Sequence, residues 1–81
     1  MRVHIDLESD VFPYRQLANQ LRDAIQAGDY LPGRPIPSGQ ALVRETGLAL
    51  ETVRRAVAVL VDEGLVYTVQ GRGTFVTKDP P

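Results

Sequence analysis

Residues 40–65 read QALVRETGLALETVRRAVAVLVDEGL, and two helical patterns meet in this stretch at Gly47. In the second pattern the apolar residues recur at the spacing of one helix face. This predicted stripe consists of Val53, Val57, Leu60, Val61 and Gly64. Opposite it we expect Glu51, Arg55 and Asp62, with Thr52 and Arg54 on the two flanks. The stripe predicts a helix that is anchored by one face and exposes a polar, cationic first turn.

A helix of this form can enter the major groove of DNA and meet base edges and phosphates. Arg54 and Arg55 could also be ordinary solvated residues, and Arg55 has the i, i+4 spacing to pair with Glu51.

The elements around this stretch are marked by their ends. Pro13 suits a first helical position and Gly28 a helix stop, which places a first helix at about 14–27. Ser38 is a good N-cap for a helix at 39–46, whereas Ala49 gives no side-chain cap to a helix at 50–63. The first helix is predicted to bury Tyr14, Leu17, Leu21, Ala24 and Ile25, and to turn Gln16, Asn19, Gln20, Arg22, Asp23 and Gln26 to water or a partner.

Two β-branched and aromatic runs, 65–69 and 74–77, predict strands joined by the turn Gln70-Gly71-Arg72-Gly73. Between the first two helices, Ile36 lies between two prolines and can form at most a short edge strand. Residues 1–12 fit either an extended arm or a loose segment. The predicted class is mainly α with a small β hairpin, a winged helix-turn-helix over 13–77, with an arm at 1–12 and a tail at 78–81.

Composition excludes several classes of function. The chain has 81 residues, no Cys and a single His, His4, so we expect one domain without a metal or cofactor. No apolar run approaches the roughly 18 residues of a membrane span, and the N-terminus does not resemble a signal peptide. We therefore expect a soluble cytoplasmic protein. No nucleophile–base set or phosphate loop indicates an enzyme.

The formal net charge is −1, but its distribution matters more than its sum. Between residues 34 and 55 four Arg stand against two Glu, and residues 67–78 hold Arg72 and Lys78 but no acid. One face of the domain is therefore predicted to be basic, which suits contact with phosphates.

At this point the chain resembles the DNA-binding domain of the GntR family of bacterial transcription regulators. The resemblance covers 13–77 and rests on motifs in order: Pro13-Tyr14-x-Gln16-Leu17-Ala18, Gly28-x-Tyr30-x-Pro32-Gly33, Ile36-Pro37-Ser38, Glu45-Thr46-Gly47-Leu48, Thr52-Val53-Arg54-Arg55-Ala56, Glu63-Gly64-Leu65-Val66 and Gly71-Arg72-Gly73-Thr74-Phe75-Val76. It implies DNA contacts from four places: the start of the second helix, the turn before the third helix, the first turn of the third helix and the wing tip. The candidate DNA-binding residues are Ser38, Gln40, Glu51, Thr52, Arg54, Arg55, Gln70, Gly71, Arg72 and Gly73.

Three positions depart from the family pattern. Family members commonly carry Arg where this chain has Gln40 and Leu50, and Ser or Thr where it has Ala49. Gln40 can still bond an adenine edge at two points, and Ala49 and Leu50 could meet thymine methyls or nothing. No family operator sequence is therefore carried over to this chain.

The leading hypothesis is a sequence-specific double-stranded DNA binder that represses transcription, with two copies on an inverted repeat. The alternative is a winged-helix protein-interaction module that does not bind DNA, which the acidic balance and the apolar Ala49 and Leu50 favour. The 81 residues leave no room for a small-molecule effector domain. Between a short stand-alone family member and an excised domain, we expect the stand-alone protein. Tyr14, Tyr30, Tyr67 and Phe75 are interpreted as core or rim residues.

Overall fold

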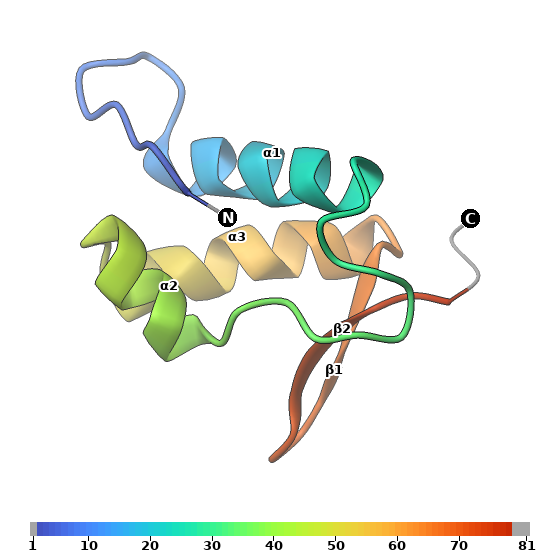
Figure 1. The fold of residues 1–81 in the computed structure, drawn as a ribbon. Coiled ribbons are helices and arrows are strands. Elements are labelled where there is room, and N and C mark those ends of the chain that lie inside the picture. The colour runs from blue at the N-terminus through green and yellow to red at the C-terminus, as the bar shows by residue number, and fades with distance from the viewer. Residues whose placement is uncertain (1, 79–81) are drawn as a thin grey trace.

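Three helices are followed by a two-stranded hairpin in the computed structural model, which describes residues 2–78 (Figure 1). The elements are α1 (Pro13–Gln26), α2 (Gly39–Thr46), α3 (Leu50–Asp62), β1 (Val66–Val69) and β2 (Gly73–Val76). Each boundary lies within one residue of its predicted position. The predicted winged helix-turn-helix class is therefore confirmed. Of the predicted arm and tail, Met1 and residues 79–81 lie outside the described residues.

Local chemistry sets the helix ends as predicted. Pro13 opens α1, where its missing N–H costs nothing. The Ser38 hydroxyl caps α2 by accepting from the Ala41 N–H at 3.1 Å. Gly47 closes α2 with a left-handed φ of 74°, a conformation that glycine adopts without steric cost. Ala49 precedes α3 without a side-chain cap, so α3 depends on packing for its position.

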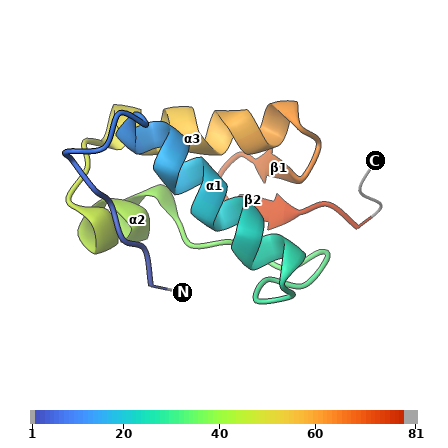
Figure 2. The same ribbon diagram turned by 90° about the horizontal axis from the view of Figure 1, so that it is seen from above.

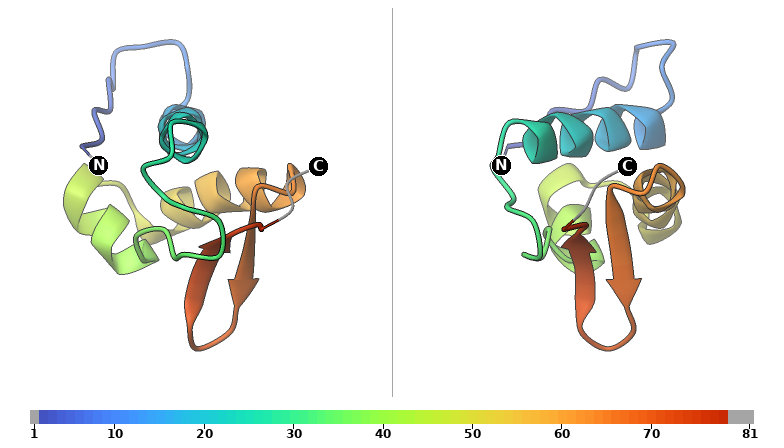
Figure 3. Two further views of the ribbon diagram at one scale, coloured as in Figure 1. Left: turned by 45° about the vertical axis from the view of Figure 1, so that its right-hand side comes forward. Right: turned by 90° about the vertical axis from the view of Figure 1, so that its right-hand side faces the viewer.

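The core lies around α3, which has α1 on one side and the hairpin on the other (Figure 3). On α3 the buried residues are Val53, Ala56 and Leu60, all at 0% exposure. The predicted stripe is wrong at one edge, because Val61 is 40% exposed while Ala56 takes a core place. The reason is that α1 and the hairpin approach α3 from different directions, which moves the centre of its buried face. The core residues are Leu17, Ala18, Leu21, Ile36, Leu42, Val53, Ala56, Leu60, Val66 and Val76.

The hairpin is antiparallel, with Thr68 opposite Thr74 and Val66 opposite Val76. A short third segment flanks β2, since the Ile36 N–H donates to the Thr74 carbonyl and the Val76 N–H to the Arg34 carbonyl, both at 2.9 Å. The predicted edge contribution of Ile36 is thus confirmed, and Ile36 itself is buried at 5% exposure. This pairing fixes the base of the hairpin to the helical core.

The N-terminal arm is held by two glutamines of α1, one turn apart. Gln20 binds the backbone of His4 through both its amide atoms, at 2.9 and 2.6 Å. Gln16 accepts from the Asp6 N–H at 2.8 Å and donates to the Asp6 and Val11 carbonyls at 2.8 and 2.7 Å. These bonds hold the arm against this face of α1, and residues 7–11 form turns and bends rather than an extended segment.

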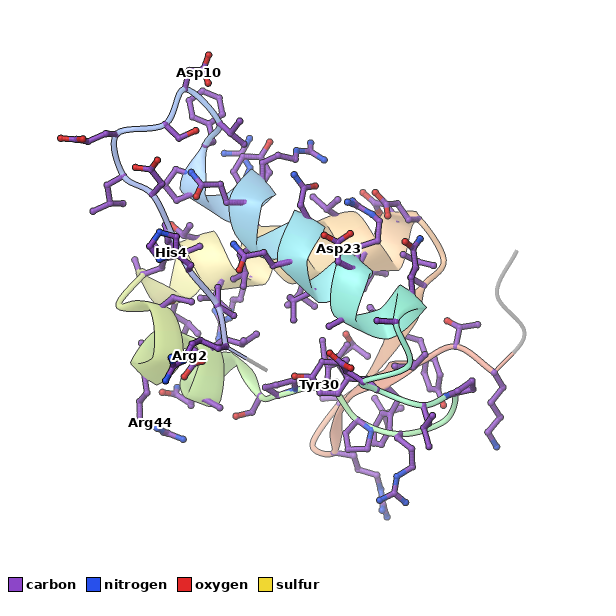
Figure 4. All side chains as sticks on the ribbon, turned by 45° about the horizontal axis from the view of Figure 1, so that its top comes forward. Arg2, His4, Asp10, Asp23, Tyr30 and Arg44 are labelled. Atoms are coloured by element: carbon purple, nitrogen blue, oxygen red, sulfur yellow. The ribbon has the colours of Figure 1, made fainter. Side chains whose placement is uncertain are left out.

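The arm runs from α2 along α1 and then loops away from the helices (Figure 2). Its Val3 N–H donates to the Glu45 carboxylate of α2 at 3.3 Å, and Val3 and Ile5 pack against the core. Asp10 lies at the outer end of the loop, and His4 lies close to the helices (Figure 4).

A two-point ion pair joins α1 to the end of α3. Arg22 Nε donates to Glu63 Oε1 at 2.8 Å, and Arg22 NH2 to Glu63 Oε2 at 2.6 Å. These hydrogen bonds hold the pKa of the Glu63 carboxyl below its usual value. Arg22 was predicted to face water or a partner, and its partner is α3. No helix within residues 2–78 is both long and apolar enough to cross a membrane.

Candidate nucleic-acid interface

The first turn of α3 gathers four of the predicted residues. Glu51, Thr52, Arg54 and Arg55 line one shallow surface hollow. Thr52 is half-buried, and the other three are exposed. The two guanidinium groups therefore stand free of the core at the end of a well-anchored helix.

The carboxylate in this turn pairs with Arg54. Arg54 NH1 lies 3.2 Å from Glu51 Oε1, at i, i+3 spacing. The i, i+4 pair between Glu51 and Arg55, which the spacing allows, is not formed. Both spacings are open to a helical glutamate, and here a neighbouring aromatic ring takes Arg55 instead.

That ring is Tyr14 of α1. The Arg55 Cζ lies 4.1 Å from the centroid of the Tyr14 ring, well within cation–π range. Tyr14 is half-buried and packs against the core, which agrees with its interpretation as a rim residue. Arg55 therefore contacts α1, whereas Arg54 lines the groove on the side of the hairpin.

The start of α2 adjoins the hairpin side of α3. Ser38, Gln40, Leu50 and Arg54 lie in the walls of a groove of about 490 Å³ that extends to Thr68 and Thr74 of the hairpin. Ser38 and Gln40 are exposed. The structure therefore brings Gln40 and Arg54, from different helices, to one surface.

The wing tip forms a separate group. Gln70, Gly71, Arg72 and Gly73 are all exposed at the end of the hairpin that points away from the helices (Figure 1). Gly71 and Gly73 have φ of 79° and 128°, and a Cβ at either would meet no atom within 4 Å. The glycines are therefore required by the turn conformation rather than by lack of space. Because the tip projects away from the helices (Figure 1), a ligand must be extended to contact both.

Two apolar residues near this surface were not among the candidate DNA-binding residues. Leu50 faces the groove beside Arg54, and Phe12 stands next to Tyr14 at 69% exposure. An exposed Phe immediately before a helix is a signal that the sequence offers, but its place beside Arg55 depends on how α1 packs on α3.

An exposed cationic helix start, a second helix start in the same groove and a projecting glycine hairpin together define a class. It is the winged helix-turn-helix domain of transcription regulators.

The family model described as bacterial regulatory proteins, gntR family, matches residues 13–76. The chain therefore belongs to the gntR family, whose members are DNA-binding transcription regulators. It is 40% identical over 76 residues to the HTH-type transcriptional repressor NagR of Bacillus subtilis (strain 168), covering 94% of this chain and 31% of NagR. The chain thus spans about a third of the length of that relative.

Solved structures agree with the fold. The GntR-family transcription factor YtrA from Sulfolobus acidocaldarius superimposes with a TM-score of 0.87 at 37% identity, over 98% of this chain and 83% of YtrA. AraR(DBD) in complex with operator ORE1 gives a TM-score of 0.81 at 37% identity, over 91% of this chain and 93% of that chain.

Proposed function

We propose that residues 13–77 bind a specific double-stranded DNA site with the first turn of α3 in the major groove and the wing alongside. One observation carries this proposal. All ten candidate residues lie on the surface, nine exposed and Thr52 half-buried, and those of α2 and α3 lie beside one another. In this proposal the chain acts in the cytoplasm and represses transcription by occupying a promoter.

Each candidate group has a role that suits its chemistry. Gln40 and Arg54 line the same groove, so they can bond neighbouring base edges, an adenine for the amide and a guanine for the guanidinium. Thr52 can bond a base or phosphate from the flank of α3 next to Arg55. Glu51 can accept from a cytosine amine and repels phosphate in a wrong register.

The remaining groups suit the DNA backbone. Arg55 and Arg72 carry charge without a carboxylate partner among residues 2–78, which suits phosphate contacts. Ser38 and Gln70 can donate to phosphates, and the exposed glycines Gly71 and Gly73 let the wing backbone approach closely.

The relatives support a repressor that binds operators. NagR is named a transcriptional repressor, and AraR(DBD) is seen in complex with operator DNA. We propose that two copies of this chain bind an inverted repeat, each with its own α3 and wing.

Selection of bound sequences from random duplex DNA with the purified chain tests the proposal. We expect one enriched motif. On the enriched duplex, Arg54→Ala should weaken binding by about 1–3 kcal/mol and relax one base position, whereas Arg72→Ala should weaken enriched and random duplexes alike. Arg44→Ala removes an equal charge from the other end of α2 and serves as the control. Enrichment of no motif would contradict the proposal.

A protein-interaction module is the second candidate, because the groove beside α3 has apolar walls. Leu50, Val57 and Val61 line it, and Val61 is 40% exposed. Salt separates the two functions. DNA binding releases counterions into solution, and the entropy gained by that release falls as the salt concentration rises, so DNA affinity weakens steeply. Apolar docking has no such dependence. Absence of binding to any duplex even at low salt, together with salt-insensitive binding of a protein partner, would favour this second candidate.

A further inference from the structure

Two guanidinium groups lie close to the Tyr14 ring, and one of them comes from the first turn of α3. The Arg55 Cζ lies 4.1 Å from its centroid and the Arg15 Cζ 5.3 Å. Arg55 comes from α3, and the ring from α1. The position of Arg55, which is proposed to contact a phosphate, therefore depends on a residue of another helix.

Stacking on a ring has a different consequence from pairing with a carboxylate. The Glu51 carboxylate takes up one donor of Arg54 and offsets part of its charge. An aromatic ring contacts only the face of a guanidinium. The N–H donors lie in the plane of the guanidinium and point outward, so they stay free. Arg55 is therefore restrained in orientation while its donors stay available for two-point binding of a phosphate.

Phe12 extends this surface outward. Its ring stacks with that of Tyr14 at 6.3 Å between centroids and an interplanar angle of 17°, yet it remains 69% exposed. Phe12, Tyr14 and Arg55, named here the aromatic ledge, border a hollow of about 250 Å³ whose other walls are Pro13, Leu48 and Thr52. An apolar wall with a cation at its rim matches a deoxyribose joined to its phosphate.

The ledge adjoins the surface that meets DNA in the proposed function. Thr52 and Arg55 line both this hollow and the one at the first turn of α3. Figures 1 and 2 show α1 and α3 starting on the same side of the domain. A duplex whose major groove receives the start of α3 therefore passes its backbone in front of the ledge.

We propose that the aromatic ledge is a second binding site for the DNA backbone. Tyr14 acts as a positioning residue that holds Arg55 toward a phosphate, and Phe12 packs on the adjoining deoxyribose. This inference rests on the proposed function, because the same helix turn must approach a duplex.

The test measures affinity by fluorescence anisotropy, at several salt concentrations, for two probes: the duplex enriched by selection and a duplex of scrambled sequence. Arg55→Ala should weaken both and lower the salt slope by about one. Tyr14→Leu should weaken binding about 2–5-fold when Arg55 is present, and should have no further effect in the Arg55→Ala background. Tyr14→Phe keeps the ring and should restore the affinity. An equal loss from Tyr14→Leu in both backgrounds would overturn the positioning role.

Two further variants keep the test independent of the stability of Tyr14→Leu. Arg55→Lys keeps the charge but not the flat group, so the salt slope should persist while affinity falls about 2–5-fold. Phe12→Ala should weaken binding about 3-fold, as expected for about 25 Å² of covered ring. Leu7→Ala is its control, because Leu7 is an arm residue at 77% exposure.

Unchanged affinity in Arg55→Lys, or equal affinities in Phe12→Ala and Leu7→Ala, would overturn the ledge while leaving the proposed function intact. Failure of the unaltered chain to bind either duplex would instead overturn the proposed function, and the ledge with it.

Discussion

Glu51 lies 3.2 Å from Arg54 and both side chains are largely exposed, at 86% and 67%. Replacing Glu51 by Gln keeps the shape of the first turn and removes only the carboxylate charge. In the proposed interface this charge restrains Arg54 and repels phosphate. We therefore expect Glu51→Gln to bind DNA of random sequence more tightly than the unaltered chain.

The size of the effect follows from the exposure of the pair. An exposed ion pair is worth about 0.2–1 kcal/mol, so releasing Arg54 strengthens its contacts by about 1.4–5-fold. Two phosphates about 8 Å from the carboxylate, screened by physiological salt, each add about 0.2 kcal/mol of repulsion. Removing that repulsion contributes about another factor of 2. The expected gain on random DNA is therefore about 3–10-fold.

The assay is anisotropy with random and enriched duplexes at fixed salt. The enriched duplex should gain less than the random one, so the ratio of the two affinities should fall. Asp23→Asn is the matched control, because it removes an equal charge from an exposed position of α1 that lines neither hollow at the start of α3. Unchanged affinity of Glu51→Gln for random DNA, or an equal gain in Asp23→Asn, would refute the reasoning.

Three further predictions concern stability. Glu63→Gln should lower the free energy of unfolding by about 0.5–1 kcal/mol at neutral pH. Because the pKa of Glu63 is lower in the folded chain than its usual 4.5, the pair with Arg22 stabilises the fold above about pH 4.5 and loses this effect as pH falls through the folded pKa. Denaturant unfolding at a series of pH values should therefore show the two proteins converging in acid, and a constant difference would contradict the ion pair. Gln16→Ala should remove the protection of the Asp6 amide from hydrogen exchange while the His4 amide, bonded to Gln20, stays protected, whereas Gln26→Ala on the same helix should leave both protected. Ala49→Ser should raise the free energy of unfolding by about 0.5–1 kcal/mol, because the serine hydroxyl can cap α3. A lower melting temperature would contradict this prediction.

Much of the fold could be predicted because its signals are local. Pro13 marks a helix start by its missing N–H, and Ser38 and Gly47 mark helix ends through bonds to residues at most four positions away. The β-branched runs around the Gly71 turn mark the hairpin in the same way. Such signals need no knowledge of the rest of the chain, which is why each boundary agrees to within one residue.

The sequence predicted which residues of the candidate site lie on the surface, but not which side chain each of them contacts. The surface location of Arg54 and Arg55 follows from helical period, yet the partner of each does not. Glu51 is one turn from both, and the ring of Tyr14 decides between them by taking Arg55 at 4.1 Å. The wing glycines were recognised by motif, and the prediction that they contact DNA awaits the binding experiments.

The amino-acid sequence by itself determined the order and limits of the elements, the class of fold and the family, because each depends on spacing and turn chemistry along the chain. Tertiary structure alone decided the long-range contacts. Arg22 and Glu63 are separated by 41 residues, and Gln20 and His4 by 16. The physical reason is that a helix offers several polar faces of similar local energy, and only the packing of α1 against α3 determines which partner each face meets.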